Sequence, residues 1–157
     1  MVAIAVAAAA TWADVEWLRA QTRLPLVLKG ILGAADARLA VAAGADGVIV
    51  SNHGGRTLDG LPATIDALPA VAEAIDARAP VLMDGGIRRG TDVLKAIALG
   101  ARAVLVGRPY VHGLAVAGAA GVAHVVDMLR SELEAAMVLS GRRRLAEIDR
   151  SLLWQAG

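Results

Sequence analysis

The stretch that decides the fold is Gly47-Val48-Ile49-Val50-Ser51-Asn52-His53-Gly54-Gly55-Arg56. Its β-branched run stops in polar and glycine residues, which is typical of a buried strand that ends in a loop. The loop carries an imidazole at His53 and a guanidinium at Arg56. Histidine can accept a proton near neutral pH, and arginine can bind a carboxylate through two parallel hydrogen bonds. The pair suits a small acid that loses a proton; the alternative is a glycine turn with two solvated side chains.

The pattern of a strand followed by a helix recurs along the chain. Residues 99–106 repeat the pattern of residues 43–50, passing through Gly-Ala into an apolar run. Repeated units of this kind predict a parallel sheet with helices outside it, either a (β/α) barrel or a doubly wound sheet. The expected strands are 24–30, 47–50, 80–84 and 103–106, and the expected helices are about 12–21, 34–43, 65–75, 92–99, 122–137 and 145–153.

Capping residues bound several of these helices. Thr11 is the expected N-cap of the first helix and Thr91 that of the fourth. Gly44 and Gly100 are the expected helix stops. The run 142–144 consists of three arginines and is expected to be solvated, complementing the dipole at the end of the long helix.

Each expected strand ends at a group that can take part in chemistry. In parallel α/β folds, ligands bind at the carboxyl ends of the strands. Four functional ends out of four are hard to assign to chance. In strand order the groups are Lys29; Ser51 with His53 and Arg56; Asp84 with Arg88; and Gly107 with Arg108.

The last two strand ends indicate an anion site. Residues 84–90 (Asp-Gly-Gly-Ile-Arg-Arg-Gly) and Gly107-Arg108 are glycine turns that enter helices. Backbone N–H groups at such turns can face a phosphate, and barrels often hold one after their last two strands. The alternative is tight packing of strand against helix, with the arginines solvated.

The composition fits one α/β domain of 157 residues, with 57% hydrophobic residues, no Phe and no Cys. A formal charge of +1 argues against nucleic acid or an anionic membrane as the main partner. The absence of cysteine makes the cytoplasm the default compartment.

Residues 1–10 are an Ala-rich lead segment, without the basic start of a signal peptide and too short to span a bilayer. His112 and His124 are expected at the surface or in packing, and no spacing indicates a metal site.

Four motifs carry a family resemblance: Leu28-Lys29-Gly30, Ser51-Asn52-His53-Gly54-Gly55-Arg56 with Leu58-Asp59, Asp84-Gly85-Gly86-Ile87-Arg88-Arg89-Gly90-Thr91-Asp92, and Val106-Gly107-Arg108-Pro109. In this order they resemble the FMN-dependent α-hydroxy acid oxidase and dehydrogenase family, which includes glycolate, lactate and mandelate or hydroxymandelate oxidases. The resemblance covers about residues 11–157. It implies that the four units are strands five to eight of a (β/α)8 TIM barrel, so that the chain is a C-terminal half-barrel.

The resemblance implies a role for each residue on the substrate side. His53 would be the base that takes a proton from the substrate as its α-carbon is oxidised, and Arg56 would bind the substrate carboxylate. Lys29 would lie by the N1/O2 edge of the flavin, where its charge favours the anionic reduced form. Asp59 would support His53, although a solvated loop acid is also consistent with its position. The implied reaction is oxidation of an L-2-hydroxy acid to a 2-oxo acid, with oxygen or another acceptor reoxidising the flavin.

The resemblance also implies FMN as the cofactor. Ser51 would hydrogen-bond the flavin ring. Another FMN barrel with the same phosphate site is the rival enzyme, but a base beside a carboxylate clamp is specific to hydroxy acids. The residues that would hold the ribityl chain and the phosphate are Asp84, Gly85, Gly86, Arg88, Gly107 and Arg108.

The sequence departs from the family pattern in two ways. Thr57 stands where many members carry Gln, a change expected to be tolerated. The larger departure is the missing amino-terminal half, which in the family supplies four strands, two active-site tyrosines, an aspartate partner for the histidine and further flavin contacts. Tyr110 is the only tyrosine and cannot replace them.

Four parallel strands cannot close a small barrel, and they leave two unpaired edges and an apolar inner face. The chain is therefore expected to be one piece of a longer protein, to pair with a second copy of itself, or to fold alone as a non-catalytic flavin-binding module. The sequence leaves open which hydroxy acid is used and whether the chemistry is that of an oxidase, a dehydrogenase or a monooxygenase. It also leaves open the oligomeric state and the activity of this half alone.

Overall fold

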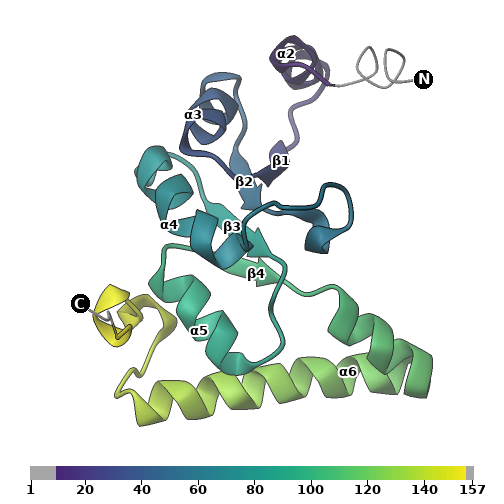
Figure 1. Ribbon diagram of the computed structural model, residues 1–157, viewed down its shortest axis with the longest axis vertical. Coiled ribbons are helices and arrows are strands. Elements are labelled where there is room, and N and C mark those ends of the chain that lie inside the picture. The colour runs from purple at the N-terminus through teal and green to yellow at the C-terminus, as the bar shows by residue number, and fades with distance from the viewer. Residues whose placement is uncertain (1–9, 155–157) are drawn as a thin grey trace.

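The computed structural model describes residues 10–154, so the predicted lead segment 1–10 lies almost wholly outside the described residues. Strands and helices alternate along the chain as the sequence predicts (Figure 1). The strands are Val27–Ile31 (β1), Gly47–Val50 (β2), Val81–Asp84 (β3) and Ala103–Leu105 (β4). The helices are Trp12–Gln21 (α2), Ala34–Ala42 (α3), Thr64–Ile75 (α4), Gly90–Ala98 (α5) and Arg108–Leu139 (α6), with 3₁₀ turns at His53–Gly55 (η1), Leu145–Glu147 (η2) and Arg150–Leu152 (η3).

The strands form one parallel sheet in the order β1-β2-β3-β4. A doubly wound sheet reverses its strand order at a switch point, whereas here every strand lies beside its neighbours in sequence. The order therefore selects the barrel alternative. Helices α3, α4 and α5 lie along one side of the strands (Figure 1). Within the described residues β1 and β4 are the outer strands, so the sheet is open at both edges.

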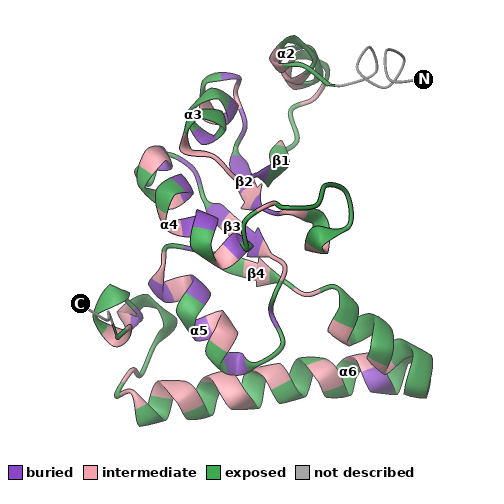
Figure 2. Cartoon of the chain, in the orientation of Figure 1, coloured by how far each residue is buried: buried purple, intermediate pink, exposed green. Residues whose placement is uncertain are grey.

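The core lies between the sheet and these helices (Figure 2). The helical spacing of Leu68, Val71 and Ile75 places all three on the inner face of α4, where each is fully buried. They meet β2 and β3, whose Val48, Val50 and Met83 are also buried. The two central strands are thereby fixed, and their carboxyl ends come to the same edge of the sheet.

Helix α6 is longer than the predicted helix 122–137, and it is broken. Ala117 and Gly118 leave the helical conformation, with Gly118 at φ +57°. The two arms fold back on each other, and a Cβ added at Gly113 or Gly121 would overlap the carbonyl of the other glycine. By length and composition α6 is a candidate membrane span. Only 6% of the residues in its most apolar stretch are buried. The break makes it a helical hairpin rather than one continuous rod.

The N-cap of α5 is Arg89, two residues before the predicted Thr91. Thr91 lies inside the first turn, and the carboxylate of Asp92 instead accepts the N–H groups of Arg88 and Arg89 at 3.0 and 2.9 Å. The N-cap at Thr11 is confirmed, because its hydroxyl accepts the N–H of Asp14.

Strand β1 also begins later than the predicted 24–30. The backbone N–H of Leu26 donates to the Asp46 carboxylate at 2.7 Å, so the chain joins the ladder only from Val27. The stops at Gly44 and Gly100 are confirmed by their positive φ angles of 88° and 112°, which favour glycine.

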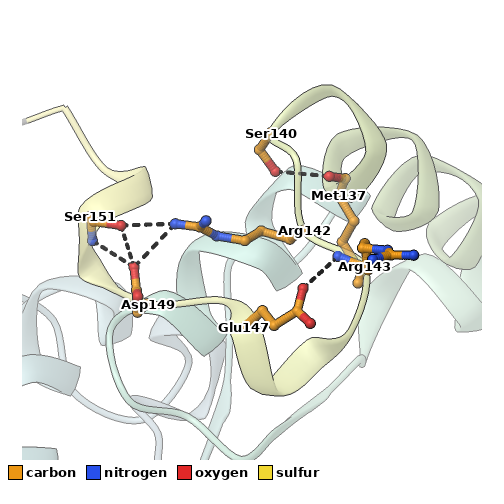
Figure 3. Close-up of polar contacts among 7 residues, drawn as sticks. All are labelled: Met137, Ser140, Arg142, Arg143, Glu147, Asp149 and Ser151. Atoms are coloured by element: carbon orange, nitrogen blue, oxygen red, sulfur yellow. Dashed lines mark hydrogen bonds and ion pairs between the residues drawn. The ribbon is translucent and has the colours of Figure 1, made fainter.

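In the arginine run 142–144, Arg143 and Arg144 are exposed as predicted, whereas Arg142 is not (Figure 3). The Arg142 guanidinium donates to the Ser151 hydroxyl at 2.9 Å and lies 3.5 Å from the Asp149 carboxylate. Its side chain is only 27% exposed. These contacts hold η3, and the N–H of Arg143 donates to the Glu147 carboxylate of η2 at 2.8 Å. The two 3₁₀ turns take the place of the single helix predicted over 145–153.

Candidate active site

The carboxyl ends of all four strands surround one cavity of about 670 Å³. The parallel order brings them to one edge of the sheet, as the sequence analysis expects. Most of the predicted site residues line this cavity: Lys29, His53, Arg56, Asp84, Gly85, Gly86, Arg88, Gly107 and Arg108. Ser51 is buried beneath the cavity, at 2% exposure.

One side of the cavity holds a linked set of polar groups from three neighbouring strands. The Lys29 ammonium lies 2.9 Å from Oδ2 of Asp84 and donates to the Ser51 hydroxyl at 2.8 Å. The other carboxylate oxygen of Asp84, Oδ1, is buried and has no hydrogen-bond partner within the described residues. A buried carboxylate oxygen of this kind is an acceptor ready for a ligand hydroxyl.

The loop after β2 carries the predicted base in an unusual conformation. His53 has a φ of +55°, in the left-handed region that non-glycine residues seldom occupy. Its backbone N–H donates to the Ser51 hydroxyl at 3.1 Å. The next residue, Gly54, donates its N–H to Oδ1 of Asn52 at 3.0 Å. Local side-chain acceptors therefore hold the backbone on both sides of the imidazole.

Another part of the cavity lining is cationic and offers open backbone for close approach of a ligand. Gly85 and Gly86 have φ angles of +83° and +75°, and a Cβ added at Gly86 or Gly107 would meet nothing within 4 Å. Arg88 and Arg108 supply two positive charges to the same lining. The combination of open glycine backbone and guanidinium groups suits an anion.

Arg108 reaches from the start of α6 to the loop after β2, where its Nη2 donates to the carbonyl of Gly54 at 3.3 Å. A second, smaller cavity of about 360 Å³ adjoins this point and shares Gly54, Gly85, Gly86 and Arg108 with the first. The anion side and the loop of His53 are therefore in direct contact.

Asp59 lies apart from these groups. Its carboxylate is exposed and accepts the N–H of the next residue, Gly60, at 2.9 Å, and it does not line the cavity. Its role as a partner of His53 stays a prediction, and its position favours the solvated loop acid.

Sequence reasoning missed part of the cavity lining. Tyr110, Val111 and His112, from the first turns of α6, line the cavity, although His112 was assigned to surface or packing. The signal was available, because these residues directly follow the fourth strand end at Gly107. Among residues 10–154, no group of three or more His, Asp and Glu side chains is placed to hold a metal ion.

Fold and site together define a class of protein. Sequential parallel βα units whose charged, imidazole and glycine-turn residues meet at the carboxyl edge of the sheet are part of a (β/α)8 barrel. The family model described as FMN-dependent dehydrogenase matches residues 1–155. The chain belongs to this family.

Similar proteins of known name are 2-hydroxy-acid oxidases. A peroxisomal (S)-2-hydroxy-acid oxidase of Oryza sativa subsp. japonica is 59% identical over 147 residues, covering 94% of this chain and 40% of the relative. An L-lactate oxidase of Nostoc sp. is 57% identical over 145 residues, covering 92% and 40%. The chain thus spans about 40% of the length of these relatives.

Solved structures agree on the fold. The crystal structure of mandelate oxidase with (S)-2-phenylpropionate matches with a TM-score of 0.87 and 53% identity, covering 90% of this chain and 42% of that one. The four strands are therefore part of a TIM barrel, as the sequence analysis expects.

Proposed function

We propose that this chain forms the cofactor-binding and carboxylate-binding half of an FMN-dependent enzyme that oxidises L-2-hydroxy acids to 2-oxo acids. The observation that carries the proposal is the meeting of Lys29, His53 and Arg56 with an anion-binding turn around one cavity of about 670 Å³. The names of the similar proteins, as 2-hydroxy-acid, lactate and mandelate oxidases, support it.

The residues around the cavity fit FMN. The open backbone at Gly86 and Gly107, with Arg88 and Arg108, suits the phosphate. The unpartnered Oδ1 of Asp84 suits a hydroxyl of the ribityl chain. A nucleotide with a phosphate and a polar ring would use both the cationic glycine turns and the polar groups of Lys29 and Asp84, which line the same cavity.

The side chains of this chain supply the substrate chemistry. When bound, FMN would accept the two electrons of the oxidation. Arg56 would bind the substrate carboxylate through paired hydrogen bonds and so orient the α-carbon. His53 would take up and hold one of the two protons that the hydroxy acid loses, and the other would go to FMN with the two electrons. Lys29 would keep positive charge beside the cofactor, where negative charge builds up on reduction.

Topology favours the remaining strands of the barrel as the partner. In a (β/α)8 barrel each helix occupies one position between two strands. This chain fills the position before β1 with α2 and the position after β4 with α6. A second copy would bring its own α2 and α6 to the same two positions, whereas a segment that begins and ends with a strand fits without overlap. We therefore prefer a missing amino-terminal half over self-pairing.

A non-catalytic flavin-binding module is the alternative, because β1 and β4 are open edges within the described residues. Lacking the other half, such a module would bind flavin without turnover.

We keep the cytoplasm as the proposed compartment on the sequence alone. Nucleic acid and membranes are not among the partners we propose.

Equilibrium titration of FMN by fluorescence quenching tests the proposed cofactor site. Arg88→Ala and Arg108→Ala should each weaken FMN binding by roughly 10- to 100-fold, since each removes charge-assisted hydrogen bonds to phosphate. Arg102→Ala is the matched control. Arg102 is exposed and directly precedes β4, whereas Arg108 follows the other end of that strand.

The control variant should bind FMN like the wild type. Riboflavin, which lacks the phosphate, should be bound weakly by all variants alike. Equal FMN affinities for wild type, Arg88→Ala and Arg108→Ala would remove the phosphate assignment.

A further inference from the structure

We propose that Asn52 is a positioning residue for the proposed reaction: its side-chain amide ties together both ends of the loop that carries His53 and Arg56. The proposal deepens the hydroxy-acid function above and rests on it. Asn52 lies between Ser51 and His53 in the sequence, and it does not line the 670 Å³ cavity.

The loop after β2 needs an external restraint. Residues 55–60 are all exposed (Figure 2), so packing contributes little to their order. His53 at φ +55° is in a conformation that persists only where surrounding contacts hold it. Without a restraint, the spacing between the imidazole and the guanidinium would not be fixed.

Asn52 supplies that restraint at both ends of the loop. Its Oδ1 accepts the N–H of Gly54 at 3.0 Å, directly after His53. Its Nδ2 donates to the carbonyl of Pro62 at 3.1 Å, ten positions along the chain. One side chain therefore fixes the exit of the loop from β2 and its return towards α4.

The same side chain also contacts the anion turn. A Cβ added at Gly85 would lie 3.4 Å from Oδ1 of Asn52, so the amide packs directly against this turn. Asn52 also lines the smaller cavity, together with Gly85 and Arg108. The loop of the base is thus held against the turn proposed to bind phosphate.

Only a primary amide satisfies both hydrogen bonds. The Gly54 N–H requires an acceptor and the Pro62 carbonyl requires a donor, and asparagine offers one of each at this length. Aspartate keeps the acceptor and loses the donor. Alanine loses both. Comparing asparagine, aspartate and alanine at position 52 therefore separates the effect of the hydrogen bond to Gly54 from that of the hydrogen bond to Pro62.

The test uses the full chain, with and without FMN, as wild type, Asn52→Ala, Asn52→Asp and Thr57→Ala. Thr57 is the matched control, an exposed polar residue of the same loop. NMR measures amide exchange at His53 and Gly54 and the backbone mobility of residues 55–60. Titrations measure the affinities for FMN and for pyruvate, a simple 2-oxo acid.

Asn52→Ala should speed exchange of the Gly54 amide about tenfold or more, because its acceptor is gone. It should also raise the mobility of residues 55–60 and weaken pyruvate binding about tenfold, with a clearly smaller loss of FMN affinity, because Asn52 contacts the phosphate turn only at Gly85. Asn52→Asp should keep the Gly54 amide protected yet still loosen the loop. Thr57→Ala should match the wild type in every measurement.

Wild-type mobility of residues 55–60 in both Asn52 variants would overturn the proposal. So would a parallel loss of FMN and pyruvate binding with a lower unfolding temperature, because that pattern describes general destabilisation. Failure of the proposed function is a separate outcome: the wild type would then bind neither FMN nor pyruvate, and the NMR measurements would still decide what Asn52 does. If Asn52→Ala does not fold, Asn52→Asp alone decides, because it retains the cap on Gly54.

Discussion

Replacing Asp84 by asparagine should destabilise the chain through the loss of its ion pair with Lys29. The two charged groups are 2.9 Å apart. At an effective dielectric constant of about 20, two unit charges at this distance attract by about 6 kcal/mol before desolvation is subtracted. The side chains are 17% exposed for Asp84 and 40% exposed for Lys29, so water screens much of this attraction.

The net effect should fall between two known limits. Exposed pairs contribute about 0.2–1 kcal/mol, and breaking a fully buried pair costs about 3–5 kcal/mol. For this half-buried pair we expect Asp84→Asn to lower the free energy of unfolding by about 1–2 kcal/mol, since asparagine keeps the shape and part of the hydrogen bonding. In a chain of this size that corresponds to a fall of about 2–8 °C in the unfolding temperature.

Thermal unfolding followed by circular dichroism measures this, and Glu134→Gln is the matched control. Glu134 pairs with Arg130 on α6 at 3.9 Å, with both side chains about two-thirds exposed. Its loss should change the free energy of unfolding by less than about 0.5 kcal/mol. Equal stabilities for Asp84→Asn and Glu134→Gln would refute this reasoning. They would show that the ion pair between Lys29 and Asp84 contributes no more to the free energy of unfolding than an exposed pair does.

In an enzyme reconstituted with the remaining strands, His53→Ala should lower kcat by about 10²- to 10⁴-fold and spare FMN binding, and an unchanged rate would remove the assignment of the base. Arg56→Lys should raise KM for the hydroxy acid about tenfold or more, because the paired geometry of guanidinium and carboxylate is lost; unchanged kinetics would remove the clamp. Gly90→Ala should lower the unfolding temperature by several degrees, since its Cβ would overlap the backbone of Leu133 where α5 crosses α6. A hydrogen bond from the Gly90 N–H, and after it one from the Arg89 guanidinium, hold the pKa of Glu132 below its ordinary range. The ionised Glu132 carboxylate therefore stabilises the fold above about pH 4.3, and this stabilisation is lost as the pH falls further. Glu132→Gln should therefore be less stable than wild type at pH 7 and approach it near pH 3, and a pH-independent difference in urea midpoints would contradict this.

The sequence predicted the sheet and most of the site because both follow from local pattern. An apolar β-branched run such as Gly47–Val50 has few alternatives to a buried strand. Once the strands are parallel, topology alone brings their carboxyl ends to one edge. Lys29, Asp84 and Arg108 could therefore be placed in one site without knowledge of any side-chain contact.

Features that depend on contacts between distant segments were not predicted. Residues 115–121, around the break in α6, are all alanine or glycine except Val116, so this stretch lacks the large apolar residues whose periodicity marked residues 122–137. The hairpin exists because Gly113 and Gly121 permit close approach, and that becomes visible only in three dimensions. The cavity lining at Tyr110 and His112 is a different case, because both directly follow the fourth strand end at Gly107 and the sequence order already indicates their place.

Competition among capping groups explains two further errors. Thr91 is a good N-cap residue, but the carboxylate of Asp92, at the third helical position, accepts the N–H groups of Arg88 and Arg89 and so places the helix start before Thr91. Arg142 was assigned to solvent because arginines usually are. Its contacts with Asp149 and Ser151 depend on how the C-terminal turns fold back, which no local pattern encodes.

The most direct test of the account is the visible absorption spectrum of the chain mixed with FMN, recorded before and after anaerobic L-lactate. We expect a flavin band perturbed by the chain alone. We also expect the band to bleach on L-lactate once the amino-terminal strands of a relative are supplied. A spectrum identical to that of free FMN, unmoved by L-lactate with or without those strands, would contradict the proposal that these strand ends form a flavin and hydroxy-acid site.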